Sequence, residues 1–173
     1  YHPLIASILY VRVIESTPYL VMPFYEDNLK DYIDKRTDID LVDGLIFCLQ
    51  ICKGLLFARS RGLKAHQDLK PANILLEDLS KRYRGFPPKG ARECLKWRVR
   101  IADFGLANAW QQLGLEYIRG SKPYVSPEQW SKGGDLSRSD NFALGVIFAE
   151  LLTGKHPIGK RTSDVWPTPA VGY

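Results

Sequence analysis

Residues 66–76 read HQDLKPANILL, and they place several polar side chains directly before a strongly apolar stretch. Asp68 and Lys70 bring a carboxylate and an ammonium group to one point. The carboxylate can accept or orient a hydroxyl proton, and the ammonium group can stabilise charge on a transferring phosphoryl group. Asn73, five residues after Asp68, offers an oxygen to a hard cation such as Mg²⁺. The alternative is a solvated turn, because Lys-Pro-Ala-Asn is also favourable turn chemistry.

Three further segments follow along the chain. Residues 101–107 read IADFGLA and put Asp103 at the end of a strand, before a flexible glycine. This position suits a metal ligand, although an ordinary strand-to-turn aspartate has the same pattern. Residues 120–130 read GSKPYVSPEQW. Residues 139–153, SDNFALGVIFAELLT, predict a strongly apolar helix that Gly154 ends.

The remaining hydrophobic pattern predicts a mixture of strands and helices. Short apolar runs rich in β-branched and aromatic residues predict strands at 3–14, 18–24, 73–77 and 97–102. Helical spacing predicts a short amphipathic helix over 26–36. A second helix, over 41–60, is capped by Asp40 and is apolar on most sides. Such a helix is normally buried.

Composition and cysteine count limit the cellular setting. The 173 residues are about one domain's worth, and a hydrophobic fraction of 45% supplies a core. No apolar run approaches the ~18 residues of a membrane span, and the N-terminus lacks the basic start and cleavage signal of a secretory leader. Three cysteines, an odd and sparse number, indicate a reducing compartment. We therefore expect a cytoplasmic protein, with Cys48 and Cys52 packed in the core rather than beginning a metal site.

A block of positive charge lies within residues 81–100, where eight lysines and arginines accompany a single acid, Glu93. This block accounts for the net charge of +5 and favours an acidic partner. Tyr83, Phe86 and Trp97 lie among the cations, and such a mixture also binds single-stranded nucleic acid. A solvated insert is the simpler interpretation, and we do not expect a nucleic-acid partner.

In this order, the four segments resemble a eukaryotic-type protein kinase domain. HQDLKPAN is similar to the catalytic loop, DFG to the metal-binding turn, SPE to the end of the activation segment, and residues 139–157 to the long central helix of the large lobe. HPLI and YLVMPF are similar to the strands that lead to the hinge between the lobes. The resemblance implies an α+β, protein-kinase-like fold. Residues 1–25 would be a remnant of the small lobe and hinge, and residues 26–173 would form the large lobe, with a basic insert at about 78–96 and an activation segment at 103–128.

The resemblance also implies which residues act on ATP, Mg²⁺ and a protein substrate. Asp68 would receive and orient the substrate hydroxyl, Lys70 would touch the γ-phosphate, and Ser121 would bridge the two. The ligands of Mg²⁺ would be Asn73 and Asp103. The adenine site would be formed by the gatekeeper, the hinge backbone and a residue under the ring, which are Met22, Pro23, Tyr25 and Leu75. An internal spine would contain Ile8, His66, Phe104 and Asp140, and the last would bond to the catalytic-loop backbone. Lys70 and Ser121 are typical of kinases that act on serine or threonine.

The sequence departs from the family's pattern in four ways. Gln67 stands where many kinases have an arginine that pairs with a phosphorylated activation loop, and glutamine cannot offer that charge. The basic insert lengthens a connection that is usually a tight hairpin. The chain contains no Gly-rich phosphate loop and no strand lysine with its glutamate partner. It also stops soon after GKHP, so that Glu128 lacks the arginine with which it would normally pair.

These departures leave three interpretations open. The chain lacks an initiator methionine, and we expect it to be a fragment of a longer Ser/Thr protein kinase that is inactive by itself. The alternative is a kinase-like regulatory module, a pseudokinase, that binds a partner without transferring phosphate. A small-molecule kinase of similar fold is a third interpretation, but such enzymes tend to lack the lysine two places after the aspartate and the SPE segment. The presence of Asp68, Lys70, Asn73 and Asp103 together favours the protein kinase.

Overall fold

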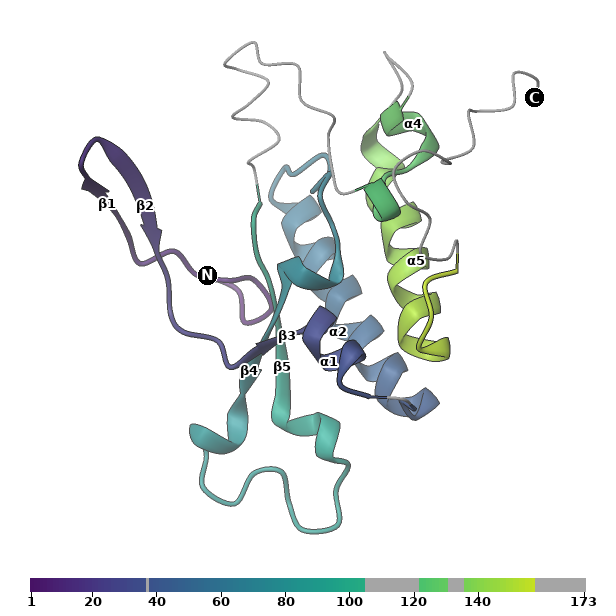
Figure 1. The fold of residues 1–173 in the computed structure, drawn as a ribbon. Helices are drawn as coiled ribbons and strands as arrows, with labels where there is room; N and C mark the ends of the chain where they lie inside the picture. Colours follow the sequence, from purple (N-terminus) through teal and green to yellow (C-terminus); the bar gives the residue numbers. More distant parts are fainter. Residues whose placement is uncertain (37, 105–121, 131–135, 158–173) are drawn as a thin grey trace, which may run out of the picture.

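The structure, a computed structural model, describes residues 1–36, 38–104, 122–130 and 136–157. Figure 1 shows a two-stranded hairpin that stands away from a larger body of strands and helices. The hairpin pairs β1 (Tyr10–Ile14) with β2 (Thr17–Val21) in antiparallel register. Its turn consists of Glu15 and Ser16, whose φ angles are +47° and +66°. The turn is thus shorter than the ESTP segment suggests, because Thr17 and Pro18 already belong to β2.

Apolar side chains on both faces of this hairpin are exposed. They include Tyr10, Val11, Val13, Tyr19 and Leu20, and Val13 is 66% exposed. A two-stranded hairpin without a packed face is marginally stable in water. The hairpin therefore presents apolar surface that no described part of the chain covers.

The segment before β1 has a different role from the one predicted. Residues 3–14 were expected to form one strand, but the strand begins only at Tyr10. Ile5 instead forms a parallel bridge with Ile101, with a hydrogen bond of 2.8 Å from the Ala6 N–H to the Ile101 carbonyl. A second bond of 3.0 Å runs from the Ile101 N–H to the Leu4 carbonyl. The N-terminal segment thus lines the free edge of the larger sheet.

The larger sheet has the order β3–β4–β5 and is antiparallel. Its strands are β3 (Asp27–Asn28), β4 (Ile74–Asp78) and β5 (Trp97–Ile101). Alternation along β4 and β5 turns one set of side chains into the core: Ile74, Leu76, Val99 and Ile101 are fully buried. The intervening residues Leu75, Glu77, Arg98 and Arg100 belong to the opposite face.

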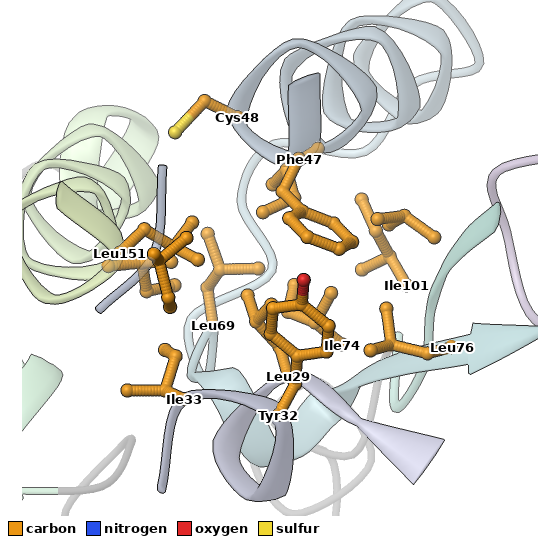
Figure 2. Packing of buried hydrophobic residues seen from close by; sticks show 14 of the residues in the cluster. Leu29, Tyr32, Ile33, Phe47, Cys48, Leu69, Ile74, Leu76, Ile101 and Leu151 are labelled. Atoms are coloured by element: carbon orange, nitrogen blue, oxygen red, sulfur yellow. The ribbon is translucent and has the colours of Figure 1, made fainter. Parts of the chain in front are cut away.

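The core lies between this sheet and three helices, α1 (Leu29–Asp34), α2 (Leu41–Ser60) and α5 (Ser139–Thr153). Figure 2 shows Phe47, from α2, beside the ring of Tyr32 and the side chains of Ile74 and Ile101. The Phe47 and Tyr32 rings meet edge to face, with centroids 4.9 Å apart. Side-chain caps begin α1 and α2, because Asn28 accepts from the Asp31 N–H at 3.0 Å and Asp40 from the Val42 N–H at 2.9 Å. Gly154, with a φ of +65°, ends α5 as predicted.

The prediction that α2 is buried on most sides is wrong for one face. Its inner face packs against β5 and α5, and Gly54 allows a close approach, since a Cβ there would lie 2.7 Å from Cδ1 of Ile101. The described chain does not cover the outer face, where Leu41, Leu45, Leu49 and Leu56 are 50–66% exposed. By its length and composition α2 is also long and apolar enough to cross a membrane, although charged residues interrupt its apolar run. The core helix of a domain has the same length and composition, and the buried face of α2 fits that role.

The remaining described elements are short. The helix α4 spans Pro127–Trp130. Single 3₁₀ turns occupy Pro71–Asn73, Leu79–Lys81, Glu93–Lys96, Lys122–Tyr124 and Leu136–Arg138. Two of these turns form the two ends of the connection between β4 and β5, which extends beyond the end of β4 and the start of β5 (Figure 1).

Candidate active site

The loop that contains Asp68 is held by a carboxylate from α5. The Asp140 Oδ1 and Oδ2 atoms accept hydrogen bonds from the His66 N–H at 3.0 and 2.8 Å. Oδ1 also accepts from the Gln67 N–H at 3.0 Å. Asp140 is buried in the first turn of α5, and a buried carboxylate requires such donors. The backbone bond that the resemblance implied for Asp140 is therefore present.

His66 ties the same loop to the end of β5. Its Nε2 atom lies 2.7 Å from the Ala102 carbonyl oxygen, and its ring meets Phe104 edge to face at 4.7 Å. His66 is itself buried. Ile8, which the resemblance placed in the same spine, is 57% exposed and lies near the start of the hairpin. The structure therefore places His66 in contact with both Phe104 and Asp140. Ile8 is instead exposed and is not part of this buried group.

Three of the predicted site residues meet through direct hydrogen bonds. The Lys70 Nζ atom lies 2.8 Å from Asp68 Oδ2. Asn73 Nδ2 donates to the Asp68 carbonyl at 2.9 Å and to Oδ2 of the same residue at 3.1 Å. Pro71 starts the 3₁₀ turn that carries Asn73 into the buried strand β4, so this side chain has a rigid support. The side chains of Asp68 and Lys70 are about one third and one quarter exposed, which leaves the pair accessible to a substrate.

Asp103 reaches the same region through the backbone. The Ala102 N–H donates to the Asn73 carbonyl at 2.9 Å, so the residue before Asp103 is bonded to the end of the catalytic loop. Asp103 is exposed and has a φ of +63°, which is uncommon for a residue other than glycine. Strained backbone of this kind is concentrated at functional sites. The backbone bond of Ala102 thus places Asp103 two positions after β5, next to the loop that ends at Asn73.

Oxygen donors at Asn73 and Asp103 suit Mg²⁺, which takes few protein ligands and completes its shell with water and phosphate oxygens. The amide nitrogen of Asn73 bonds to Asp68, which leaves the amide oxygen to face a cation. Among the described residues, no cluster of three or more histidine, cysteine, aspartate or glutamate side chains could hold a metal ion by itself. Asn73 and Asp103 thus supply oxygen donors of the kind that Mg²⁺ takes.

The residues predicted to contact adenine lie on two segments. Leu75 is half-buried in β4, where it pairs with Asn28 of β3. Met22 and Pro23 follow directly after β2 on the path to β3, and the Ser7 N–H lies 3.4 Å from the Tyr25 hydroxyl oxygen. The path from β2 to β3 thus runs from the hairpin to the strand beside Leu75. Ser121 lies outside the described residues.

Residues 122–130 are anchored on α5 and on the catalytic loop. The Tyr124 hydroxyl donates to Glu150 Oε2 at 2.7 Å, and burial together with that carboxylate raises the pKa of Tyr124. Glu128 has no ion pair with any described residue. Gln129 Nε2 donates to the Gln67 carbonyl at 2.8 Å. Sequence reasoning missed Gln129, because an uncharged amide 62 positions from its partner gives no signal in the pattern.

The three cysteines are free thiols. Burial raises the pKa of Cys48 and of Cys94 to about 12, so both are protonated near neutral pH. Cys48 belongs to the main core cluster, as predicted, but Cys52, for which the same was predicted, is only half-buried and lies outside that cluster.

The arrangement of this loop, the small sheet and the helices is that of a partial protein-kinase-like fold, and comparison with known proteins agrees. The chain belongs to the protein kinase domain family, whose model matches residues 1–167. It is 32% identical over 160 residues to the probable serine/threonine-protein kinase PknB of Lactococcus lactis subsp. lactis (strain IL1403). It is 30% identical over 160 residues to the serine/threonine-protein kinase PrkC of Bacillus subtilis (strain 168). Each match covers 90% of this chain but only 23% and 22% of the relative's length.

Proposed function

We propose that this chain is part of an ATP- and Mg²⁺-dependent protein kinase that phosphorylates serine or threonine in a protein substrate. Residues 1–25 belong to the small lobe and hinge, and residues 26–173 belong to the large lobe. One observation carries the proposal: Asp68, Lys70 and Asn73 converge through hydrogen bonds of 2.8–3.1 Å beside the strand that leads to Asp103. The names of the two relatives support serine and threonine as acceptors.

Each residue of the cluster has a distinct task in this mechanism. When bound, Mg-ATP supplies the γ-phosphoryl group. Asp68 accepts a hydrogen bond from the substrate hydroxyl and orients its oxygen, and it can take the proton as that oxygen is phosphorylated. Lys70 lies beside that carboxylate, where its charge stabilises negative charge on the phosphoryl oxygens. Asn73 fixes the position of Asp68 through its amide nitrogen, and with Asp103 it would hold Mg²⁺.

Substitutions in the full-length protein test these roles separately. Asp68→Asn keeps the shape of the side chain and removes its charge, so Mg-ATP should still bind while single-turnover transfer to a serine/threonine peptide falls ~10²–10⁴-fold. Asp103→Asn removes an anionic metal ligand, so nucleotide affinity should weaken in the presence of Mg²⁺ and change little without it. Lys70→Ala should resemble Asp68→Asn. The matched control is Asp38→Asn, an exposed aspartate outside the site.

The same measurements decide between an enzyme and a regulatory module. The exposed apolar hairpin and the missing arginine at position 67 are the observations that favour a module which binds a partner without transferring phosphate. No transfer by the full-length wild type would replace the kinase assignment with the module. Full transfer by the Asp68→Asn variant would contradict the role given to Asp68.

We also propose that the basic insert binds an acidic partner through its tip. Six of the eight cations in residues 81–100 already pair with acids of this chain, as Arg92 does with Asp40 and Asp43 at 2.6 and 2.9 Å. Arg84 and Lys89 have no ion pair with a described residue and are exposed, so they are the cations left for a partner.

Replacing Arg84 and Lys89 with glutamate should abolish salt-dependent binding of an acidic peptide and leave nucleotide affinity unchanged. Binding of single-stranded nucleic acid in place of the peptide would indicate the alternative partner, and unchanged peptide binding by the variant would exclude the tip. We further propose a cytoplasmic location, which the three free thiols support.

A further inference from the structure

The backbone at Gln67 has a conformation that its surroundings must impose. Its φ angle is +68°, in the left-handed region that residues other than glycine seldom adopt. Such a conformation persists only where neighbouring groups determine it. The Gln67 side chain does not supply the restraint through its Oε1 atom, which is buried without a hydrogen-bond partner. The main chain of Gln67 is instead bonded on both sides, to Asp140 through its N–H and to Gln129 through its carbonyl.

The orientation of the Gln129 amide is fixed by Ser126. Gln129 Oε1 accepts from the Ser126 N–H at 3.0 Å and lies 3.2 Å from the Ser126 hydroxyl. A backbone N–H can only donate, so the oxygen of the amide must face Ser126 and the nitrogen must face the Gln67 carbonyl, 2.8 Å away. Ser126 is fully buried, which makes this geometry rigid.

The Gln67 carbonyl belongs to the same peptide group as the Asp68 N–H. Since that peptide group is planar, a restraint on the carbonyl oxygen also fixes the direction in which the chain enters Asp68. The Asp68 N–H lies 3.4 Å from His66 Nδ1, and the Asp68 carboxylate accepts hydrogen bonds from Lys70 and Asn73. Rotation of the peptide group would disturb all three contacts.

We propose that Gln129 is a positioning residue, which sets the orientation of Asp68 through the Gln67 carbonyl and so couples residues 122–130 to the catalytic loop. This role rests on the proposed kinase function. The coupling is a neutral hydrogen bond in a chain whose residue 67, a glutamine, cannot form an ion pair with phosphate. The coupling therefore needs no phosphate group, and we expect it to depend little on salt concentration.

The test is Gln129→Glu in the full-length protein. The substitution keeps the shape of the side chain but replaces the donor with an acceptor, so that two oxygens face each other. We expect kcat for peptide phosphorylation to fall about 10- to 100-fold while KM for ATP stays within twofold. Protonation of the new carboxyl restores a donor, so the deficit in kcat should shrink as the pH is lowered from 8 to 6.

The matched control is Gln50→Glu. Gln50 makes the same pair of backbone contacts elsewhere, since its Nε2 donates to the Trp97 carbonyl at 3.2 Å and its Oε1 accepts from the Val99 N–H at 2.9 Å. It lies at the opposite end of β5 from Asp103. The control should keep kcat within twofold of the wild type at every pH.

Amide hydrogen exchange separates a failure of this inference from a failure of the kinase assignment. Exchange in residues 66–69 should be faster in Gln129→Glu and unchanged in Gln50→Glu, whether or not the protein transfers phosphate. A wild type without activity would refute the proposed function alone, and faster loop exchange would still support the positioning role. The inference would be overturned if residues 66–69 of Gln129→Glu exchanged their amide hydrogens at the wild-type rate. It would also be overturned if the deficit in kcat were equal at all pH values.

Discussion

Asp140 accepts two hydrogen bonds from the backbone N–H of His66, although 74 positions separate the two residues. The bonds connect the catalytic loop to the first turn of α5, whose Ile147 and Leu151 are fully buried in the core. The orientation of the loop therefore depends on how α5 packs. Hydrogen bonds to a charged acceptor contribute more than neutral ones.

Replacing Asp140 with asparagine should lower both stability and activity. The variant keeps one acceptor but places an N–H₂ group against the loop N–H donors, so we expect the domain to lose about 2–3 kcal/mol of unfolding free energy. Thermal unfolding of the full-length protein, with Asp38→Asn as the control, measures the change. An unaltered melting temperature would show that the loop is held by other contacts.

Glu77 should make the stability of the domain depend on acid pH. Burial acts to raise the pKa of Glu77, but hydrogen bonds from Arg100 and Arg82 and the charges of Arg100 and Arg98 outweigh it, and the pKa lies below its ordinary value. Because the pKa is lower in the folded state, the stabilisation is complete above the unfolded-state pKa of about 4.3 and is lost as the pH falls through the folded-state pKa.

Glu77→Gln should therefore unfold at lower temperature than the wild type at pH 7 and lose less stability on acidification to about pH 3. The loss at pH 7 should be about 2–3 kcal/mol, since Arg100 is only 3% exposed and would remain as a poorly compensated charge. Thermal melts of both proteins across this pH range give the comparison. Parallel curves for the two proteins would contradict the assignment of the acid transition to Glu77.

Activity should not require phosphorylation of the loop that precedes the SPE segment. Between Asn108 and Arg119, a stretch outside the described residues, the sequence has one hydroxyl side chain, Tyr117. Gln67 has no positive charge with which to form an ion pair with a phosphate there. We expect Tyr117→Phe to keep the rate of the full-length enzyme within about twofold, measured by peptide phosphorylation. A hundredfold decrease would indicate that the tyrosine is a regulatory site.

The 173 residues alone should be inactive, with a weakly protected hairpin. The chain contains no Gly-rich phosphate loop, and both faces of β1–β2 are exposed. Because two paired strands are marginal in water, we expect amides of residues 10–21 to exchange within seconds, while β4 and β5 stay protected. Hydrogen exchange and an autophosphorylation assay on the isolated chain provide the measurements. Robust autophosphorylation would contradict this expectation.

Much of the fold could be predicted because its signals are local. Asp40 and Gly154 mark helix ends through cap chemistry, and alternation in β4 and β5 follows from burial of one face. The family resemblance supplied the spatial relation between Asp68 and Asp140, which spacing along the chain does not contain.

Other features depend on contacts that the sequence pattern does not encode. The apolar residues of α2 have no periodicity that distinguishes the covered face from the exposed one, so burial on most sides was the natural but wrong prediction. The sequence pattern gives no ion-pair partners for the cations of the basic block. In the structure most of them pair with acids of this chain, some as distant in sequence as Asp40. The Gln129 contact joins two uncharged residues and depends wholly on how residues 122–130 pack.

The connection between β4 and β5 gives experimenters a place to label this protein in living cells. Its tip, residues 83–90, leaves the sheet at the end opposite to Asp103, and the ion pairs of Arg82 and Arg92 hold the chain on either side. The entropy cost of a longer surface loop rises only slowly with its length, and exposed tips tolerate insertion. An epitope or fluorescent domain spliced there would report where the molecule resides while leaving the loop around Asp68 and the proposed phosphotransfer intact.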